Sequence, residues 1–161
     1  GSGIAPISTY VDDGINVIIA TDGAASNNNL NMMEEMHLAS LAGKGAFHDS
    51  TMLPPAMILK MATVNGAHAQ GRKDCGVIEM GKRADFIILD MDKPHLLPTH
   101  NLLANLVYSA QSSDLYMTVI DGETVYKNGE FLTIDRERVL YEVTKRVNRI
   151  CHRKKAKVRE C

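Results

Sequence analysis

Residues 17–23, with the sequence Val17-Ile18-Ile19-Ala20-Thr21-Asp22-Gly23, indicate the architecture of this chain. The first four residues form a short, continuous run of mainly β-branched side chains, which is typical of a strand buried on both faces of a parallel sheet. This strand is predicted to end at Asp22, before a turn of small and polar residues. In α/β folds the carboxyl ends of parallel strands carry the functional groups, so Asp22 is a candidate metal ligand or general base. The alternative is an aspartate that only caps a loop or a helix.

Helical patterns flank this strand and indicate an α/β region. Apolar residues recur at helical spacing over residues 4–14, 30–43 and 54–69. The last of these helices begins with two prolines, which the first turn of a helix tolerates. Residues 45–51 are predicted to form a loop. We therefore expect residues 1–70 to consist of β/α units.

The pattern changes after residue 70, where short strand patterns alternate with turns. Strands are predicted at residues 76–78, 85–90, 117–120, 124–126 and 130–132, and a helix at residues 102–110. The Asp121-Gly122 pair favours a tight hairpin turn between two of these strands. Residues 71–134 are thus predicted to form a small strand-rich module with an inserted helix.

A final helix is predicted in the last segment, residues 135–161. Asp135 is expected to cap it, and one face carries Val139, Leu140, Val143, Val147 and Ile150. This segment contains 10 Lys and Arg against 4 Asp and Glu, whereas residues 1–134 contain 8 against 15. The helix dipole favours cations at a helix C-terminus, and no aromatic residue is interleaved with the terminal basic run. We therefore favour a solvated helix end over a nucleic-acid site.

The composition is that of a globular protein. The chain has 161 residues, of which 45% are hydrophobic and 23% charged, which excludes collagen, a disordered tail and a disulfide scaffold. No apolar run approaches the roughly 18 residues that indicate a membrane helix. The first residues lack the basic region and the apolar stretch of a secretory signal. Because Cys75, Cys151 and Cys161 are few and widely spaced, we expect a reducing, cytoplasmic location.

Residues 20–30 closely resemble the last-strand motif of amidohydrolase-superfamily deaminases. Their sequence is Ala20-Thr21-Asp22-Gly23-Ala24-Ala25-Ser26-Asn27-Asn28-Asn29-Leu30. The best match is the family of 5'-methylthioadenosine/S-adenosylhomocysteine deaminases, with guanine deaminases and triazine chlorohydrolases as relatives. Further matching motifs follow in the same order at residues 33–36, 61–67, 76–90, 92–95, 105–110 and 119–125. The resemblance extends from about Gly3 to Arg149.

This resemblance implies a (β/α)8 barrel and a small β-sandwich built from both ends of the chain. It also implies one divalent metal, usually zinc, held by histidines and by an aspartate at the end of the last strand. Asp22 matches that aspartate, so the resemblance implies that Asp22 ligates the metal and takes a proton from its bound water. The metal-bound hydroxide would then attack the adenine carbon that bears the amino group, and ammonia would leave. The implied substrates are small molecules of the adenosine type.

The sequence departs from the family pattern in its other metal ligands. It contains no His-x-His motif, and its six histidines match none of the family's ligand positions. A (β/α)8 barrel alone takes about 250 residues, and a catalytic zinc site needs about three protein ligands. We therefore interpret the chain as the last β/α units of the barrel plus the C-terminal part of the sandwich, incomplete and inactive by itself. A complementary N-terminal segment or self-association is expected to cover its open strand edges.

Two alternatives remain open beside this interpretation. In the first, the chain is a non-catalytic structural or interaction fragment. In the second, it is part of another amidohydrolase, of the guanine deaminase or triazine hydrolase type. Ser26 and Asn27 could line the site beside the aspartate, but we favour that they and Asn28 cap the following helix. Structural rather than metal-binding positions are expected for His37, His95 and His100.

Overall fold

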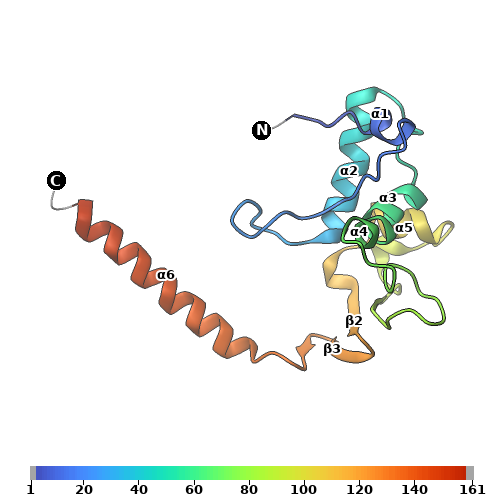
Figure 1. The fold of residues 1–161 in the computed structure, drawn as a ribbon. Helices are drawn as coiled ribbons and strands as arrows, with labels where there is room; N and C mark the ends of the chain where they lie inside the picture. Colours follow the sequence, from blue (N-terminus) through green and yellow to red (C-terminus); the bar gives the residue numbers. More distant parts are fainter. Residues whose placement is uncertain (1–2, 159–161) are drawn as a thin grey trace.

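The structure is a computed structural model that describes residues 3–158. It is a mixed helix and sheet fold, in which the helices dominate the first half and a small antiparallel sheet follows (Figure 1). The elements are, in chain order, α1 (Ile7–Asp12), α2 (Met32–Phe47), α3 (Pro55–Ala62), α4 (Val64–Ala69), β1 (Phe86–Leu89), η1 (Pro94–Leu96), α5 (Leu102–Tyr108), η2 (Ser112–Asp114), β2 (Leu115–Ile120), β3 (Glu123–Lys127), β4 (Glu130–Phe131) and α6 (Arg136–Val158).

The hydrophobic core lies between α2, α3 and α5. Its buried members are Met36, Leu53, Ile58, Met61 and Val107, and Ile58 is fully enclosed. Four of these residues come from three separate helices and Leu53 comes from the loop before α3, so the core forms only when the helices pack together. The core includes few of the chain's large apolar side chains, and many others remain exposed.

The helix predicted over residues 54–69 is two helices, because the backbone breaks at Thr63. Thr63 has φ −127° and ψ −93°, outside the helical region. Its hydroxyl donates a hydrogen bond to the carbonyl of Leu59 at 2.7 Å, a local bond that competes with the regular helical pattern. The prediction of one continuous helix is therefore wrong at this residue.

The segment predicted as the buried strand, residues 17–20, is extended but forms no strand among the described residues. Val17 and Ile19 pack against the core, whereas Ile18 on the opposite face is 44% exposed. The amide of Ile19 donates to the carbonyl of Met61 at 3.1 Å, and the side-chain amide of Asn65 donates to the carbonyl of Val17 at 2.8 Å. A strand needs a neighbouring strand to complete its ladder, and here the partners are helices.

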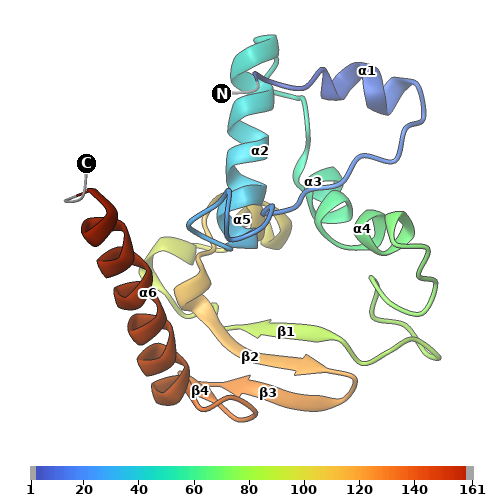
Figure 2. The same cartoon turned by 60° about the vertical axis from the view of Figure 1, so that its left-hand side comes forward.

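The strands form a four-stranded antiparallel sheet in the order β1-β2-β3-β4, and helices α1 to α5 lie to one side of it (Figure 2). The predicted hairpin is confirmed: Asp121 and Gly122 both have positive φ, at 53° and 81°, as a type I′ turn requires. The strand predicted at residues 76–78 is wrong, since Gly76 and Val77 lie in a bend and Ile78 in irregular backbone. Ile78 there is 87% exposed, so nothing pairs with it or covers it among residues 3–151.

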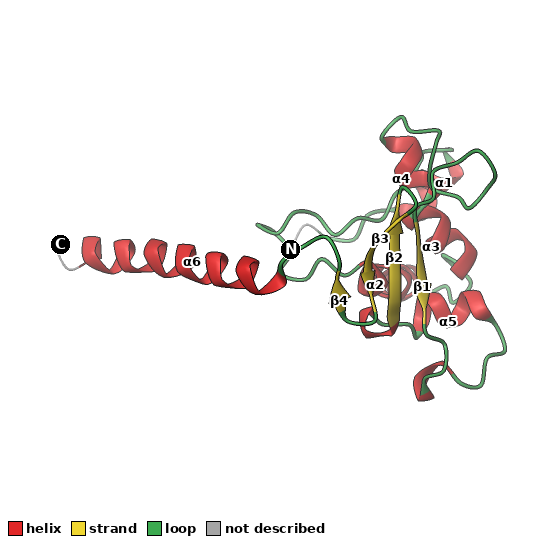
Figure 3. Cartoon of the chain, turned by 90° about the horizontal axis from the view of Figure 1, so that it is seen from below, coloured by secondary structure: helices red, strands yellow, loops and turns green. Residues whose placement is uncertain are grey.

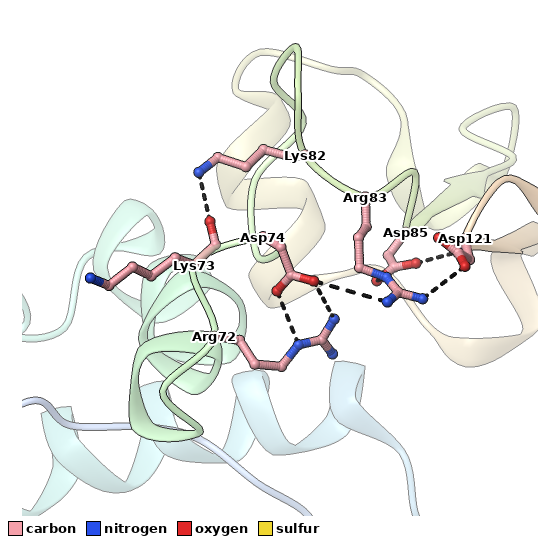
Figure 4. Close-up of polar contacts among 7 residues, drawn as sticks. All are labelled: Arg72, Lys73, Asp74, Lys82, Arg83, Asp85 and Asp121. Atoms are coloured by element: carbon pink, nitrogen blue, oxygen red, sulfur yellow. Dashed lines mark hydrogen bonds and ion pairs between the residues drawn. The ribbon is translucent and has the colours of Figure 1, made fainter.

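An ion-pair network ties the loop that precedes β1 to the hairpin turn (Figure 4). Arg83 contacts the carboxylates of Asp121 at 3.0 Å, Asp85 at 3.8 Å and Asp74 at 3.9 Å. Arg72 donates to both oxygens of Asp74 at 3.2 Å, and this pairing lowers the pKa of Asp74. Because these side chains are partly or largely exposed, the network contributes more to the path of the loop than to stability.

Helix α6 begins as predicted, with the carboxylate of Asp135 accepting a hydrogen bond from the amide of Arg138 at 2.9 Å. The helix projects away from the rest of the chain (Figures 1 and 3). Its predicted apolar face, Val139, Leu140, Val143, Val147 and Ile150, is about half exposed. The side chains of the terminal basic run lie outside the described residues.

Within residues 3–158 we find no helix with both the length and the apolar character of a membrane span.

Candidate functional site

Asp22 follows the extended segment and lies exposed in a tight turn. Its φ is +60°, in the left-handed region that few non-glycine residues adopt. One carboxylate oxygen, Oδ1, accepts a hydrogen bond from the amide of Gly23 at 2.5 Å. The Asp22 carbonyl accepts a hydrogen bond from the Thr21 hydroxyl at 3.0 Å. Backbone strain of this kind persists only where surrounding contacts hold it, and it is concentrated at functional sites.

Hydrogen bonds from Asn27 hold both sides of this turn. The Asn27 backbone amide donates to the carbonyl of Gly23 at 3.0 Å, and its side-chain Nδ2 donates to the carbonyl of Thr21 at 2.9 Å. The same Nδ2 group also donates to Oε1 of Glu35 on α2 at 2.8 Å. The turn that carries Asp22 is thereby attached to a long helix.

Helix α2 begins at a cap that the sequence interpretation misplaced. The N-cap is Asn31, whose side-chain oxygen accepts hydrogen bonds from the amides of Met33 at 3.1 Å and Glu34 at 3.4 Å. The prediction that Ser26, Asn27 and Asn28 cap this helix is therefore wrong. The Asn31-x-x-Glu34 spacing resembles a capping box and could have located the start of the helix. The contact of Asn27 with Glu35, eight residues away, has no such local pattern.

The described residues supply one carboxylate to a metal site and do not complete that site. Asp22 Oδ2 makes no hydrogen bond to any residue that the structure describes, so this oxygen can face a ligand. However, no three His, Cys, Asp or Glu side chains lie close enough together to hold a metal ion within the described part of the chain. Because a catalytic zinc needs about three protein ligands, the residues present fit the role of one ligand only.

A buried acid lies elsewhere, at η2. Asp114 is 2% exposed, and Oδ2 accepts the amide hydrogen of Gln111 at 2.8 Å and lies 2.9 Å from Nε2 of His95. Burial raises the pKa of Asp114, but the hydrogen bonds from His95 and Gln111 outweigh it, and the pKa lies below the usual range. This pair joins η1 to η2, which agrees with the structural role predicted for His95.

A known protein family matches most of this chain, including the Asp22 turn. The profile of the Amidohydrolase family matches residues 1–125. The chain belongs to the amidohydrolase family. The resemblance seen in the motifs of this chain is thereby confirmed, and the relatives that match it are named as deaminases.

Individual amidohydrolases match nearly the whole chain. The 5-methylthioadenosine/S-adenosylhomocysteine deaminase of Acetivibrio thermocellus is 52% identical over 92% of this chain, and that of Thermoanaerobacter pseudethanolicus is 47% identical over 94%. Among solved structures, a zinc-bound adenosine deaminase from Xanthomonas campestris matches 94% of the chain with a TM-score of 0.89 and 32% identity. A zinc complex of an atrazine chlorohydrolase from Arthrobacter aurescens matches 89% with a TM-score of 0.82 and 32% identity.

The match covers a limited part of each of these amidohydrolases. The chain spans 36% of the length of the two curated relatives. It spans 35% of the adenosine deaminase chain and 32% of the chlorohydrolase chain. The chain thus covers about a third of each protein, and the described residues contain only part of a metal site.

Proposed function

We propose that this chain is the Asp22-bearing part of a metal-dependent amidohydrolase that deaminates 5-methylthioadenosine and S-adenosylhomocysteine. The observation that carries the proposal is the strained, exposed Asp22 turn at the end of an extended segment. It is supported by relatives named for this activity at 47% and 52% identity. The ammonia released and the inosine-type product are what hydrolysis of the adenine amino group would leave.

Asp22 is the residue of this chain to which we assign chemistry. An exposed carboxylate at this place can supply one oxygen ligand to a divalent metal, for which zinc is the proposed identity because two of the matching structures contain it. The same carboxylate can accept the proton of the attacking water. The remaining ligands must come from outside the described residues, so the chain alone is expected to be inactive.

The proposal also gives the remaining segments a place in the parent fold. Residues 1–70 would form the last β/α units of a (β/α)8 barrel, residues 71–134 the C-terminal part of a small β-sandwich, and residues 135–161 a terminal helix and basic tail. The extended segment around Ile18 would then pair with a neighbouring barrel strand. Packing of the other barrel elements on the face of that strand would cover Ile18, which is 44% exposed.

A chimaera tests this function directly. In it, this chain replaces the matching part of the Acetivibrio thermocellus relative, and ammonia release from methylthioadenosine is measured together with zinc content. We expect activity and about one zinc per chain, and a loss of at least about 100-fold in kcat for Asp22→Asn, since a general base contributes about that much. Asp13→Asn, which changes another exposed carboxylate, is the matched control and should stay within about twofold.

Three results would contradict the proposal. A folded, zinc-containing chimaera that releases no ammonia would exclude the deaminase assignment. Full activity of Asp22→Asn would exclude the role of this carboxylate. Faster turnover of guanine or of a triazine than of methylthioadenosine would instead favour the guanine deaminase or triazine hydrolase alternatives.

The exposed apolar surface predicts association of the isolated chain. A complementary N-terminal segment or a second copy should cover it, because isolated chains rarely expose so many apolar side chains. Light scattering after size exclusion should show oligomers of the isolated chain that disappear in the chimaera. A stable monomer over a wide concentration range would contradict this part of the proposal.

A further inference from the structure

The Asp22 turn is held in place mainly by hydrogen bonds from other residues, not by those of Asp22 itself. The contacts of Asp22 itself are with its two neighbours, Thr21 and Gly23. Neither contact reaches beyond the turn, so neither can fix the turn relative to the rest of the fold. A left-handed backbone at a non-glycine residue relaxes unless more distant groups oppose the relaxation.

Asn27 provides the longer-range connection. Its carboxamide has two N–H hydrogens, and the structure uses Nδ2 as donor to the Thr21 carbonyl at 2.9 Å and to the Glu35 carboxylate at 2.8 Å. Its Oδ1 accepts the amide hydrogen of Asn29 at 2.9 Å. All polar atoms of this partly buried side chain are therefore engaged, and its orientation has no alternative with the same bonds.

Glu35 connects Asn27 to helix α2. It lies in the first turn of α2, a helix of 16 residues whose buried face contributes Met36 to the core. A carboxylate acceptor makes the bond from Nδ2 charge-assisted and therefore stronger than a neutral one. The turn is thus connected through Asn27 to the hydrophobic core.

We infer that Asn27 is a positioning residue that holds the Asp22 carboxylate in place, with Glu35 as its anchor on α2. The inference rests on the function proposed for Asp22. In this arrangement Asn27 and Glu35 touch neither substrate nor metal. They act by restricting the backbone of residues 21–23, since a displacement of a reacting group by about 1 Å can cost about 100-fold in rate.

Matched substitutions at Glu35 separate the hydrogen bond from the charge. Glu35→Gln keeps an oxygen acceptor for Asn27, whereas Glu35→Ala removes it. Asn27→Asp keeps the shape of the side chain but replaces the donor by an acceptor that faces Glu35 and the Thr21 carbonyl. Glu34→Ala is the control for loss of a negative charge in the first turn of α2, because Glu34 contacts the side chain of Asn29 and not that of Asn27.

Two measurements on these variants test the inference. The first is the kinetics of the chimaera described above, where Asn27→Asp and Glu35→Ala should lower kcat by about 10- to 100-fold with little change in KM. Glu35→Gln and Glu34→Ala should stay within about threefold. The second is hydrogen exchange of the peptide spanning residues 21–31, in the full chain and in the chimaera, which should become about tenfold faster in Asn27→Asp and Glu35→Ala.

The exchange measurement does not depend on catalysis, so it separates failure of this inference from failure of the proposed function. Faster exchange with a lowered kcat in the same two variants supports the inference. Unchanged exchange in Asn27→Asp overturns it whether or not the chimaera is a deaminase. Faster exchange with unchanged kcat also overturns it, because the turn would then be loosened without consequence for Asp22. Equal losses in Glu34→Ala and Glu35→Ala would show that charge, not the Asn27 contact, is responsible.

Discussion

Replacement of Asp114 by alanine is expected to lower the free energy of unfolding by about 2 kcal/mol at neutral pH. Asp114 is 2% exposed and accepts hydrogen bonds from Gln111 and His95. Hydrogen bonds to a charged acceptor contribute about 1.5–3 kcal/mol each. The expected loss in unfolding free energy is smaller than the sum of these two hydrogen bonds. Burial of the carboxylate costs several kcal/mol, which offsets part of their contribution. The side chain of His95 is 36% exposed, so its ring nitrogen can regain water when Asp114 is removed.

The pH dependence of this effect has a defined sign. The pKa of Asp114 is lower in the folded chain than in the unfolded chain, where it is about 3.9. The stabilisation is therefore fully present above about pH 5 and is lost as the pH falls through the folded pKa. The difference in unfolding free energy between the original chain and Asp114→Ala should be present at about pH 5 and above and should shrink below about pH 4.

Urea unfolding of the chain at a series of pH values measures this difference. Asp92→Asn is the control, since Asp92 is an exposed acid on the loop after β1, and its replacement should change stability by less than about 0.5 kcal/mol. Asp114→Asn, which retains an oxygen acceptor for Gln111, should lie between the control and Asp114→Ala. A difference that grows as the pH falls below about 4, or one no larger than that of Asp92→Asn, would refute the reasoning.

Three further substitutions test the packing and the surface of the same chain, again by urea unfolding. Gly76→Ala should destabilise the chain by about 2 kcal/mol more than Gly81→Ala. Both glycines have positive φ, but only at Gly76 would an added Cβ approach a backbone atom, the Val64 Cα, at 2.9 Å. Equal losses would argue against that close approach. Ile58→Ala should cost about 3 kcal/mol because Ile58 is fully buried, and a loss below about 1 kcal/mol would mean that the core is loose. Arg83→Met should cost at most about 1 kcal/mol and less in high salt, since its ion pairs are partly exposed (Figure 4); a salt-independent loss would contradict this.

Local patterns in the sequence determined several parts of this chain without reference to the fold. The Asp121-Gly122 turn, the Asp135 cap and the amphipathic pattern of α6 depend on residues within a few positions of each other. The motif around Asp22 likewise placed the chain in the amidohydrolase family, because it is read from consecutive residues. Patterns of this kind reflect local backbone preferences and short-range hydrogen bonds, which do not change when distant residues move.

The tertiary structure decided what depends on residues far apart in the sequence. Whether residues 17–20 pair as a strand depends on neighbours, and here Met61 and Asn65 supply the hydrogen bonds instead. The connection of the Asp22 turn to α2 likewise required Asn27 to meet Glu35 across a loop. Backbone and side-chain polar groups must find partners wherever packing places them, so strand pairing and the support of Asp22 follow from the packed chain and not from local sequence.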